Sequence, residues 1–283
     1  MEMRQTDFGE QLRGWRQLRR MSQLDLALEA DISTRHLSFI ETGRSRPSRE
    51  IVLRVAEQLD IPLRSRNLLL LAAGLAPAYP ERSLDEPALD QARKAIDMIL
   101  KGHEPFPALA VDRHWNMIAA NGALGAFLEG VSPDLLQPPV NVLRLSLHPE
   151  GVAPRILNLG EWKAHLIDRL RGQYEASADP ALGALCDELE EYPAPPARAS
   201  TEYAGILVPL MLDMGGRRLS FFSTTTIFGT PVEVTLSEIA IEAFFPADPE
   251  TAETLSGDWP KNNGADARAG KLRPPLSWNV GRP

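Results

Sequence analysis

Apolar residues in the first 75 positions recur at three- and four-residue spacing, which is the period of an amphipathic helix. The pattern predicts five helices, and Asp7 is expected to cap the first of them. The side chains expected to face inward in the first three helices are Phe8, Leu12, Trp15 and Leu18; Leu24, Ala27 and Leu28; and Leu37 and Ile40. A fourth helix is expected from Ile51, Val52, Val55, Ala56 and Leu59, and a fifth at Leu68 to Ala73.

Capping residues define the second and third helices. Ser22 is followed three residues later by Asp25, the spacing of a capping box, and Ser33 precedes the stretch Thr34 to Glu41. Between them, the turn at 30–32 contains Asp31, a residue that tolerates left-handed backbone. Gly43 is suited to end the third helix. The stretch 21–47 is therefore predicted to be two short helices joined by a tight turn.

A change of period after residue 105 indicates a second domain. Residues 107–121 alternate apolar and polar side chains around a turn at Asp112–His114, which predicts a hairpin followed by a helix at 122–128. Two longer helices and three strands are then predicted, at 154–174, 179–191, 204–214, 217–228 and 232–245. The order favours an antiparallel sheet with helices on one side, an α+β domain that begins as PAS-like domains do.

The segments around these two domains have a different composition. Residues 76–87 are rich in Pro and charge and are expected to be a hinge, and 89–100 has helical spacing. The tail lacks periodicity and is expected to be flexible, with Trp259 and Trp278 docking on the body or on a partner chain. The predicted division is 1–75 all-α domain, 76–104 linker and connecting helix, 105–255 α+β domain, and 256–283 tail.

Composition excludes several classes of protein. The 283 residues contain no apolar run long enough to span a membrane and no N-terminal signal core, so a cytoplasmic location and no membrane partner are expected. A single cysteine, Cys186, excludes an internal disulfide and a cysteine-based zinc cluster. The five histidines lack metal-ligand spacing, and no nucleophile elbow or phosphate-binding glycine loop is present. Neither an enzyme nor a cofactor is expected.

Charge is divided unevenly along the chain. The net charge is −8, but residues 1–75 hold 12 Lys and Arg against 10 Asp and Glu, a net of +2. The remainder holds 18 against 28, a net of −10. Five arginines lie within 32–54, after and within the third predicted helix, where the phosphates of a DNA duplex would lie. Two short helices followed by basic charge predict a DNA-binding domain. The protein is therefore expected to associate with the nucleoid.

Specific residues carry a family resemblance. Ser22-Gln23, Leu26-Ala27, Ile40-Glu41-x-Gly43 and Pro47-Ser48 resemble the XRE, or lambda-repressor-type, helix-turn-helix. More narrowly, STRHLSFIETGRSRPS and RSRNLLLLAAGLAPAY resemble the MmyB-like transcriptional regulators. The resemblance extends through HEPFPALAVDRHWNMIAAN and LRLSLHPEGVAPRILN into the second domain. It implies that this domain binds a ligand, fatty-acid-like or otherwise apolar.

The resemblance also implies roles for single residues. It pairs Arg16 with Glu41 and brings the third helix into the major groove. Arg35 is the preferred base reader, because arginine to guanine is the commonest specific contact, whereas Phe39 departs from the family and offers only apolar contact to a thymine methyl. Base contacts are expected from Thr34, Arg35 and Phe39, and backbone contacts from Gln23, His36, Ser38, Arg44 and Arg46. Alternatives are a protein-binding module, packing of His36, and a core or dimer role for Phe39.

A ligand pocket is expected between the sheet and the helices of the second domain. The lining is predicted to include Val111, Trp115, Ile118, Phe127, Leu166, Arg169, Leu170 and Phe222, with Leu128, Leu219 and Phe221 nearby. Asn158 and Arg169 are candidates for a polar anchor. Arg169 is expected to pair either with an anionic head group or with a surface carboxylate.

These expectations combine into a ligand-responsive transcription factor that binds double-stranded DNA. We expect a homodimer with two recognition helices one turn apart on a palindromic operator, and a ligand effect transmitted through residues 76–100. Two alternatives stay open: a DNA-bound adaptor whose second domain binds a protein and no small molecule, and an enzyme with a DNA-binding appendage.

Overall fold

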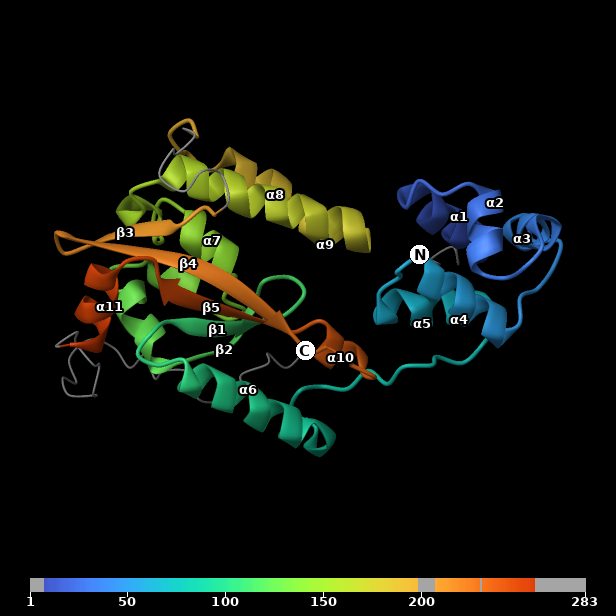
Figure 1. Cartoon of the computed structure of the whole chain (residues 1–283), viewed down its shortest axis with the longest axis horizontal. Helices are drawn as coiled ribbons and strands as arrows, with labels where there is room; N and C mark the ends of the chain where they lie inside the picture. The colour runs from blue at the N-terminus through green and yellow to red at the C-terminus, as the bar shows by residue number, and fades with distance from the viewer. Residues whose placement is uncertain (1–7, 198–206, 230, 258–283) are drawn as a thin grey trace. The chain divides into compact units, whose positions relative to one another are not determined.

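The computed structural model describes residues 8–197, 207–229 and 231–257. The chain divides into two compact units, each with its own hydrophobic core. Unit 1 comprises residues 1–82 together with 230–237, and unit 2 comprises 83–229 and 238–283 (Figure 1). The chain therefore crosses between the units three times: after 82, after 229 and after 237.

Unit 1 is a cluster of short helices around an apolar core. Its first five are α1 Phe8–Leu18, α2 Gln23–Glu29, α3 Thr34–Glu41, α4 Arg49–Gln58 and α5 Leu63–Ala72. The predicted caps are confirmed: Ser22 and Asp25 form the capping box of α2, and the Ser33 hydroxyl accepts from the backbone N–H of His36. Asp31 adopts φ 51° in the turn and Gly43 adopts φ 70° after α3.

Three sequence expectations for unit 1 were wrong. Leu18, which was expected to lie on the apolar face of the first helix, is 39% exposed. Leu24 and Leu28 are 56% and 70% exposed, and α2 buries Leu26 and Ala27. The buried stripe instead follows Leu26, Ala27 and Ala30, which have the three- and four-residue spacing of one helix face. The fifth helix begins at Leu63, five residues before the predicted apolar run at Leu68, because Pro62 pre-sets the backbone before it.

A second chain segment joins unit 1 from far along the sequence. Residues 232–245 were predicted to form one strand, but Val234–Ser237 form the short helix α10. The Glu233 carboxylate accepts from the backbone N–H groups of Leu236 and Arg82, and the Val234 N–H donates to the Pro80 carbonyl at 2.9 Å. These hydrogen bonds keep the first part of the predicted strand out of the sheet, so β5 begins only at Ala240.

Unit 2 is built on one five-stranded antiparallel sheet. The strands are β1 Ala108–Val111, β2 Met117–Ala120, β3 Leu210–Met214, β4 Arg217–Ile227 and β5 Ala240–Pro246. Their order is β2-β1-β5-β4-β3, which places the first and last strands at the centre and gives the predicted PAS-like α+β fold (Figure 1). The β4–β5 register pairs Phe222 with Phe245 and Thr225 with Glu242.

Helices cover this sheet and provide the walls of its core. They are η1 Pro87–Leu89, α6 Asp90–Gly102, η2 Gly122–Leu128, η3 Pro133–Leu136, α7 Val142–Leu147, η4 Ala153–Arg155, α8 Leu159–Ser177, α9 Pro180–Glu191 and α11 Pro249–Ser256. Figure 1 shows α7, α8 and α9 on one side of the sheet. The segment 122–128 is a 3-10 helix.

The long helix α8 begins five residues later than predicted. Ile156 forms an isolated bridge with Leu212, and the Asn158 side chain accepts from the Met211 N–H and donates to the Pro209 carbonyl. These contacts hold the chain extended against β3 up to Asn158, so helical geometry starts at Leu159. Within the described part of the chain, no helix has the length and apolar character needed to cross a membrane.

Some predictions fall outside the described residues. They are the cap at Asp7, the start of the strand predicted at 204, and Trp259 and Trp278 in the tail.

Candidate DNA-binding surface and ligand cavity

Glu41, at the last position of α3, is buried and joins three helices of unit 1. Its carboxylate accepts from Arg16 Nε at 2.7 Å and Nη2 at 2.9 Å, and from Gln23 Nε2 at 2.7 Å. Gly9 allows α1 to approach closely, because a Cβ there would lie 2.5 Å from the Glu41 carbonyl oxygen. The predicted Arg16–Glu41 pair is present, and it fixes α3 against α1 and α2.

The charge of Glu41 is stabilised by the same contacts. Burial raises the pKa of Glu41, but the hydrogen bonds from Arg16 and Gln23 and the positive charges of Arg16 and Arg13 together lower that pKa below its ordinary value. The carboxylate is therefore ionised at neutral pH. Because the Gln23 amide nitrogen is bound to Glu41, that amide faces the protein, whereas the sequence predicted it to face DNA.

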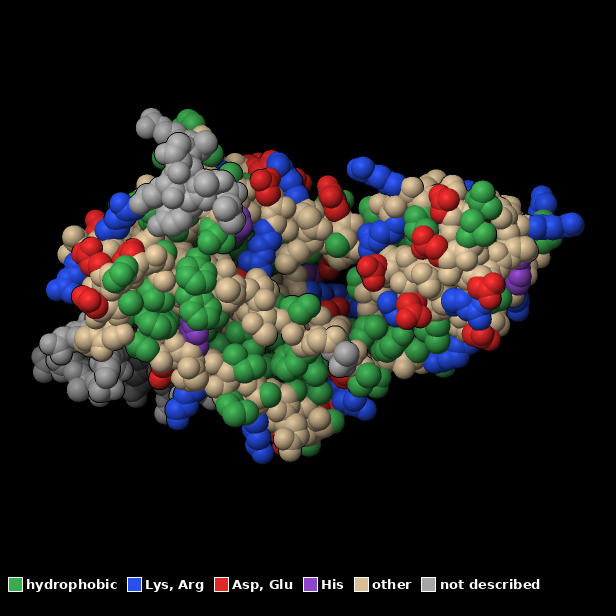
Figure 2. Space-filling view, in the orientation of Figure 1, with side chains coloured by type: hydrophobic (Ala, Val, Ile, Leu, Met, Phe, Trp, Pro, Cys, Tyr) green, Lys and Arg blue, Asp and Glu red, His purple; other side chains and the backbone are tan. Residues whose placement is uncertain are grey.

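The outward side of α3 carries two guanidinium groups against one ring. The Arg35 and Arg44 guanidinium carbons lie 5.3 Å and 5.9 Å from the centroid of the Phe39 ring. Arg35 and Arg44 are exposed and Phe39 is half-buried. Figure 2 shows basic side chains on the surface around α3, and these are arginines because unit 1 contains no lysine. The sequence did not reveal this use of Phe39, although the i, i+4 spacing from Arg35 was a signal for it.

The other predicted DNA-contact residues are also accessible. Arg46 is exposed, and Thr34, His36 and Ser38 are partly exposed. α3 and the segment after it thus present these side chains and Arg35 on the surface of unit 1.

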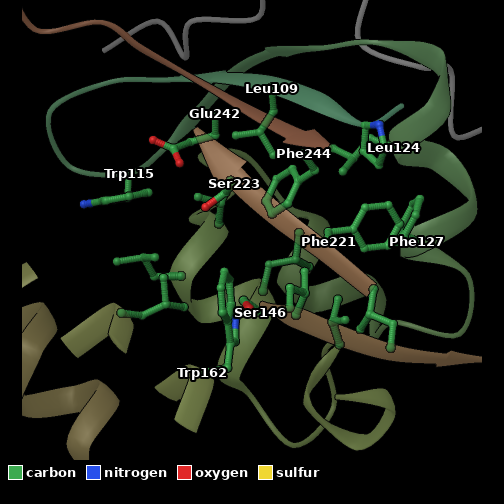
Figure 3. Close-up of a pocket in the computed structure, with 18 of the residues that line it drawn as sticks. Leu109, Trp115, Leu124, Phe127, Ser146, Trp162, Phe221, Ser223, Glu242 and Phe244 are labelled. Atoms are coloured by element: carbon green, nitrogen blue, oxygen red, sulfur yellow. Dashed lines mark hydrogen bonds between the residues drawn. The ribbon is translucent and has the colours of Figure 1, made fainter. Parts of the chain in front are cut away.

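Unit 2 contains a cavity between the sheet and the helices (Figure 3). Its volume is about 100 Å³. It is lined mainly by apolar side chains from β1, β3, β4, β5, η2, α7 and α8. In Figure 3, Leu124 and Phe127 lie at one end, and Trp115 and Glu242 lie at the other.

Half of the predicted pocket residues line this cavity. Trp115, Phe127, Leu166 and Arg169 do so, together with Leu128 and Phe221. Val111 and Leu170 are packed in the core away from it, Ile118 is partly exposed on β2, and Phe222 stacks on Phe245 with centroids 5.3 Å apart. Strand alternation accounts for Phe222, because Phe221 and Ser223 occupy the cavity face of β4.

Part of the lining that the sequence missed comes from the segment between the hairpin and the long helix. These residues are Val142, Leu143, Leu145, Ser146 and Val152, and Trp162 follows in α8. The run 142–147 forms α7 because the Asn141 side chain accepts from the N–H groups of Leu143 and Arg144. An Asn before an apolar run was the available signal.

Arg169 and Glu242 form an ion pair at the polar end of the cavity. Arg169 Nη1 lies 2.9 Å from Glu242 Oε2 and Nη2 lies 2.5 Å from Oε1, and Nη2 also donates to the Thr225 hydroxyl at 2.6 Å. The guanidinium carbon is 4.6 Å from the centroid of the Trp115 ring, whose Nε1 donates to Gln173. Of the two outcomes expected for Arg169, the structure has the carboxylate pair, and this carboxylate is buried.

Two hydroxyl groups also line the cavity. Ser146 Oγ accepts from Trp162 Nε1 at 3.0 Å, which leaves its own proton without an acceptor among the described residues. The Ser223 hydroxyl has no hydrogen-bond partner in the described part of the chain. Asn158, the other predicted anchor, is hydrogen-bonded to the backbone of Pro209 and Met211 and is not a lining residue. The described residues hold no group of His, Cys, Asp and Glu side chains suited to a metal ion.

Comparisons with protein families agree with both sites. Residues 92–256 match the model of the MmyB-like transcription regulator ligand binding domain, and residues 12–65 match a helix-turn-helix model. No curated protein gives a significant match. Because the first model covers more than half of the 283 residues, the chain belongs to the MmyB-like transcription regulators. It is a DNA-binding transcription regulator with a ligand-binding domain, and both models describe regulator domains and not enzymes.

Proposed function

We propose that this regulator recognises a specific DNA operator through α3 and that a small, mainly apolar ligand in the cavity of unit 2 controls it. It works as a homodimer on a palindromic operator, with two recognition helices about 34–36 Å apart, one turn of DNA. The exposed Leu68 and Leu71, on one face of α5, give unit 1 an apolar surface for a second copy.

The arrangement of Arg35, Phe39 and Arg44 is the observation that carries the DNA-binding part of the proposal. The ring limits the motion of both guanidinium groups, so less side-chain entropy is lost when they bind. Arg35, within α3, is the base reader, and Arg44, after the helix, neutralises a phosphate. Thr34 and Phe39 add base contacts, and His36, Ser38 and Arg46 add backbone contacts.

The apolar cavity supports the ligand part of the proposal. Pockets for drug-sized ligands have volumes of roughly 300–1,000 Å³, so a cavity of about 100 Å³ suits a molecule of one ring or a short chain. A fatty-acid-like ligand, which the sequence suggested, stays a prediction and requires the cavity to enlarge on binding.

The chain path offers a route for coupling the two sites. Strands β4 and β5 both contribute to the cavity lining, through Phe221 and Phe244 among others. The segment that connects these strands includes 230–237, which belongs to unit 1 and is bonded there to residues 80–82. A ligand that moves β4 against β5 therefore acts directly on a part of the DNA-binding unit. It shifts DNA affinity only if it binds the two states of the protein unequally.

The DNA-binding part is tested by selecting operator sequences with the full-length protein and then measuring the affinity of variants for each single-base change. Arg35→Ala is expected to lose about 1–3 kcal/mol on the selected operator and to relax specificity at one base position. Arg44→Ala is expected to weaken binding to all sequences alike and to reduce the salt slope by about 1.

Lys94→Ala is the matched control, because it removes one exposed positive charge from α6, in unit 2. It should leave both specificity and affinity unchanged. Equal loss on every operator variant for Arg35→Ala would contradict the assignment of this residue as a base reader. A footprint of one half-site without two-fold symmetry would contradict the dimer.

The ligand part is tested by mass spectrometry of small molecules extracted from the purified full-length protein. A stoichiometric apolar molecule that changes operator affinity when added back supports the proposal. Absence of any such molecule, together with a protein that co-purifies on unit 2, favours the DNA-bound adaptor instead.

A further inference from the structure

The polar end of the cavity holds one positive and one negative charge. Among the lining residues, Arg169 and Glu242 are the charged ones, and they neutralise each other. The Glu242 side chain is 5% exposed and that of Arg169 is 21% exposed. Separating them inside the protein would leave a buried carboxylate without its partner, which is strongly unfavourable.

The Arg169 guanidinium is already surrounded by protein partners. Glu242 occupies two of its nitrogens, the Thr225 hydroxyl accepts from one of them, and the Trp115 ring lies against its face. A ligand carboxylate has to displace Glu242 or lie beside it. Either arrangement brings two negative charges together at a poorly hydrated site.

No other lining group supplies positive charge to balance an anion. His165, on α8 near Trp162, has a pKa that burial, and secondarily the Arg169 cation, lowers below the ordinary value, so it is neutral at pH 7. Arg155 donates to the Phe127 carbonyl from behind the lining and is not itself a lining residue.

The hydroxyl groups of the cavity are suited to a neutral oxygen. Ser146 has a proton without an acceptor, and Ser223 can both donate and accept. Figure 3 shows Ser223 between the aromatic lining and the Glu242 end, and Ser146 beside Trp162. A hydroxyl or carbonyl group on an otherwise apolar molecule can therefore be hydrogen-bonded without breaking the ion pair.

We infer that the cavity selects an uncharged ligand, apolar over most of its surface and carrying a hydroxyl or carbonyl oxygen, and that the Arg169–Glu242 pair rejects carboxylates. This inference rests on the proposed ligand function and narrows its chemical class. It also separates the ligand of this chain from a free fatty acid, because the arginine that would bind the acid is already paired.

The test uses small probes of matched shape with the full-length protein at pH 7. Benzyl alcohol, benzoate and benzylamine differ in charge at one ring size, and hexan-1-ol and hexanoate form a linear pair. Binding is measured by calorimetry and by the concentration dependence of the melting temperature. Wild type is expected to bind each alcohol at least about tenfold more tightly than the matching carboxylate, a difference of about 1.4 kcal/mol.

Glu242→Gln is expected to remove the preference for the alcohol, because Arg169 then lacks an anionic partner. Benzoate binding should strengthen at least about tenfold while benzyl alcohol binding stays within about threefold. The double variant Arg169→Gln, Glu242→Gln removes both charges and leaves no unpaired arginine. It should bind the alcohols and still reject the carboxylates.

Two further variants assign the binding to the cavity. Ser223→Leu fills the cavity and removes a hydroxyl, so alcohol binding should fall. Ser220→Ala, on the opposite face of the same strand, should leave alcohol binding unchanged.

The outcomes distinguish the inference from the proposed function. A wild-type protein that binds benzoate or hexanoate as tightly as the matching alcohol overturns the inference and leaves a ligand-controlled regulator in place. Absence of binding by every probe to wild type and to both charge variants overturns the ligand function together with the inference. The DNA-binding proposal is tested separately by the operator experiment.

Discussion

Each unit of the protein contains a buried glutamate that pairs with the side chain of an arginine, but the surroundings of the two pairs differ. Glu41 is 3% exposed and is enclosed by α1, α2 and α3, with Arg16, Gln23 and Arg13 around it. Glu242 is 4% exposed and lines a cavity. The first pair is surrounded by protein, whereas the second has space for another molecule on one side.

This difference shows how the same kind of ion pair can have a different role in each unit. A buried pair adds little net stability compared with apolar packing, but removing one partner is strongly unfavourable. In unit 1 that penalty holds α3 in one orientation, and with it Arg35, for which we propose a contact to DNA. In unit 2 we propose that the same penalty acts on a charged ligand, because such a molecule in the cavity has to compete with the pair.

Removal of the Glu41 carboxylate is expected to have the largest effect. Glu41→Ala leaves Arg16, whose side chain is 11% exposed, buried without its partner. The free energy of unfolding of unit 1 should fall by about 3–5 kcal/mol. Urea denaturation of the full-length protein, followed by hydrogen exchange of each unit, measures the loss and assigns it to unit 1.

The control for this prediction is Glu50→Ala. It breaks the Arg54–Glu50 pair, in which the glutamate side chain is 77% exposed, and should change stability by less than about 1 kcal/mol. Equal losses of stability for Glu41→Ala and Glu50→Ala would show that burial does not increase the contribution of Glu41 to stability.

Glu242→Gln should destabilise the protein less, by about 2 kcal/mol, and only in unit 2. The amide keeps a hydrogen bond to Arg169, and Arg169 is partly solvated and retains Thr225. Hydrogen exchange confined to unit 2 would confirm the expectation. A loss of stability as large as that of Glu41→Ala would mean that the partial solvation of Arg169 beside the cavity does not reduce the cost of leaving its charge unpaired.

Acid should destabilise unit 1 through the titration of Glu41. Its pKa is lowered on folding, so the unfolded chain takes up a proton first as the pH falls. The stability due to its ionisation is complete above the unfolded value of about 4.3 and is lost as the pH falls through the lower folded pKa.

The measurement is the melting temperature of wild type and Glu41→Gln between pH 6 and pH 3. Wild type should lose stability more steeply than the variant below the unfolded value. Asp179 and Glu188 in unit 2 also have lowered pKa values, so both proteins should show a common background decline. Parallel curves of melting temperature against pH for the two proteins would show that Glu41 does not contribute to the acid sensitivity.

Local patterns made much of the fold predictable. The caps of α2 and α3, the left-handed Asp31 and the hairpin at Asp112–His114 depend on residues close in sequence, and each was predicted. The errors arose where distant residues decide. Glu233 accepts from the backbone N–H of Arg82, 151 positions away, and this contact keeps the start of the strand predicted at 232–245 out of the sheet. The contact of Ile156 with Leu212 in β3 holds the chain before α8 extended.

The same distinction applies to the candidate sites. The exposed residues of α3 follow from helical spacing, so Arg35 could be named from sequence, and Arg44 could be named because it closely follows the helix. The partner of Arg169 could not, because Glu242 lies 73 positions away on a strand whose start was misplaced. Trp115 could be named because its turn is local: it has φ 65° between β1 and β2, where the Asp112 side chain accepts from the N–H groups of His114 and Asn116.

The smallest predicted effect compares the packed and cavity faces of one strand. Ser220 and Ser223 lie on opposite faces of β4, and Ser220 Oγ is buried without a hydrogen-bond partner in the described structure. Ser220→Ala removes that unsatisfied group and should raise the free energy of unfolding by about 1 kcal/mol. Ser223→Ala should change it little, because the half-buried hydroxyl faces the cavity. Thermal denaturation of both variants measures the difference, and a loss of stability on Ser220→Ala would mean that water satisfies this hydroxyl in solution.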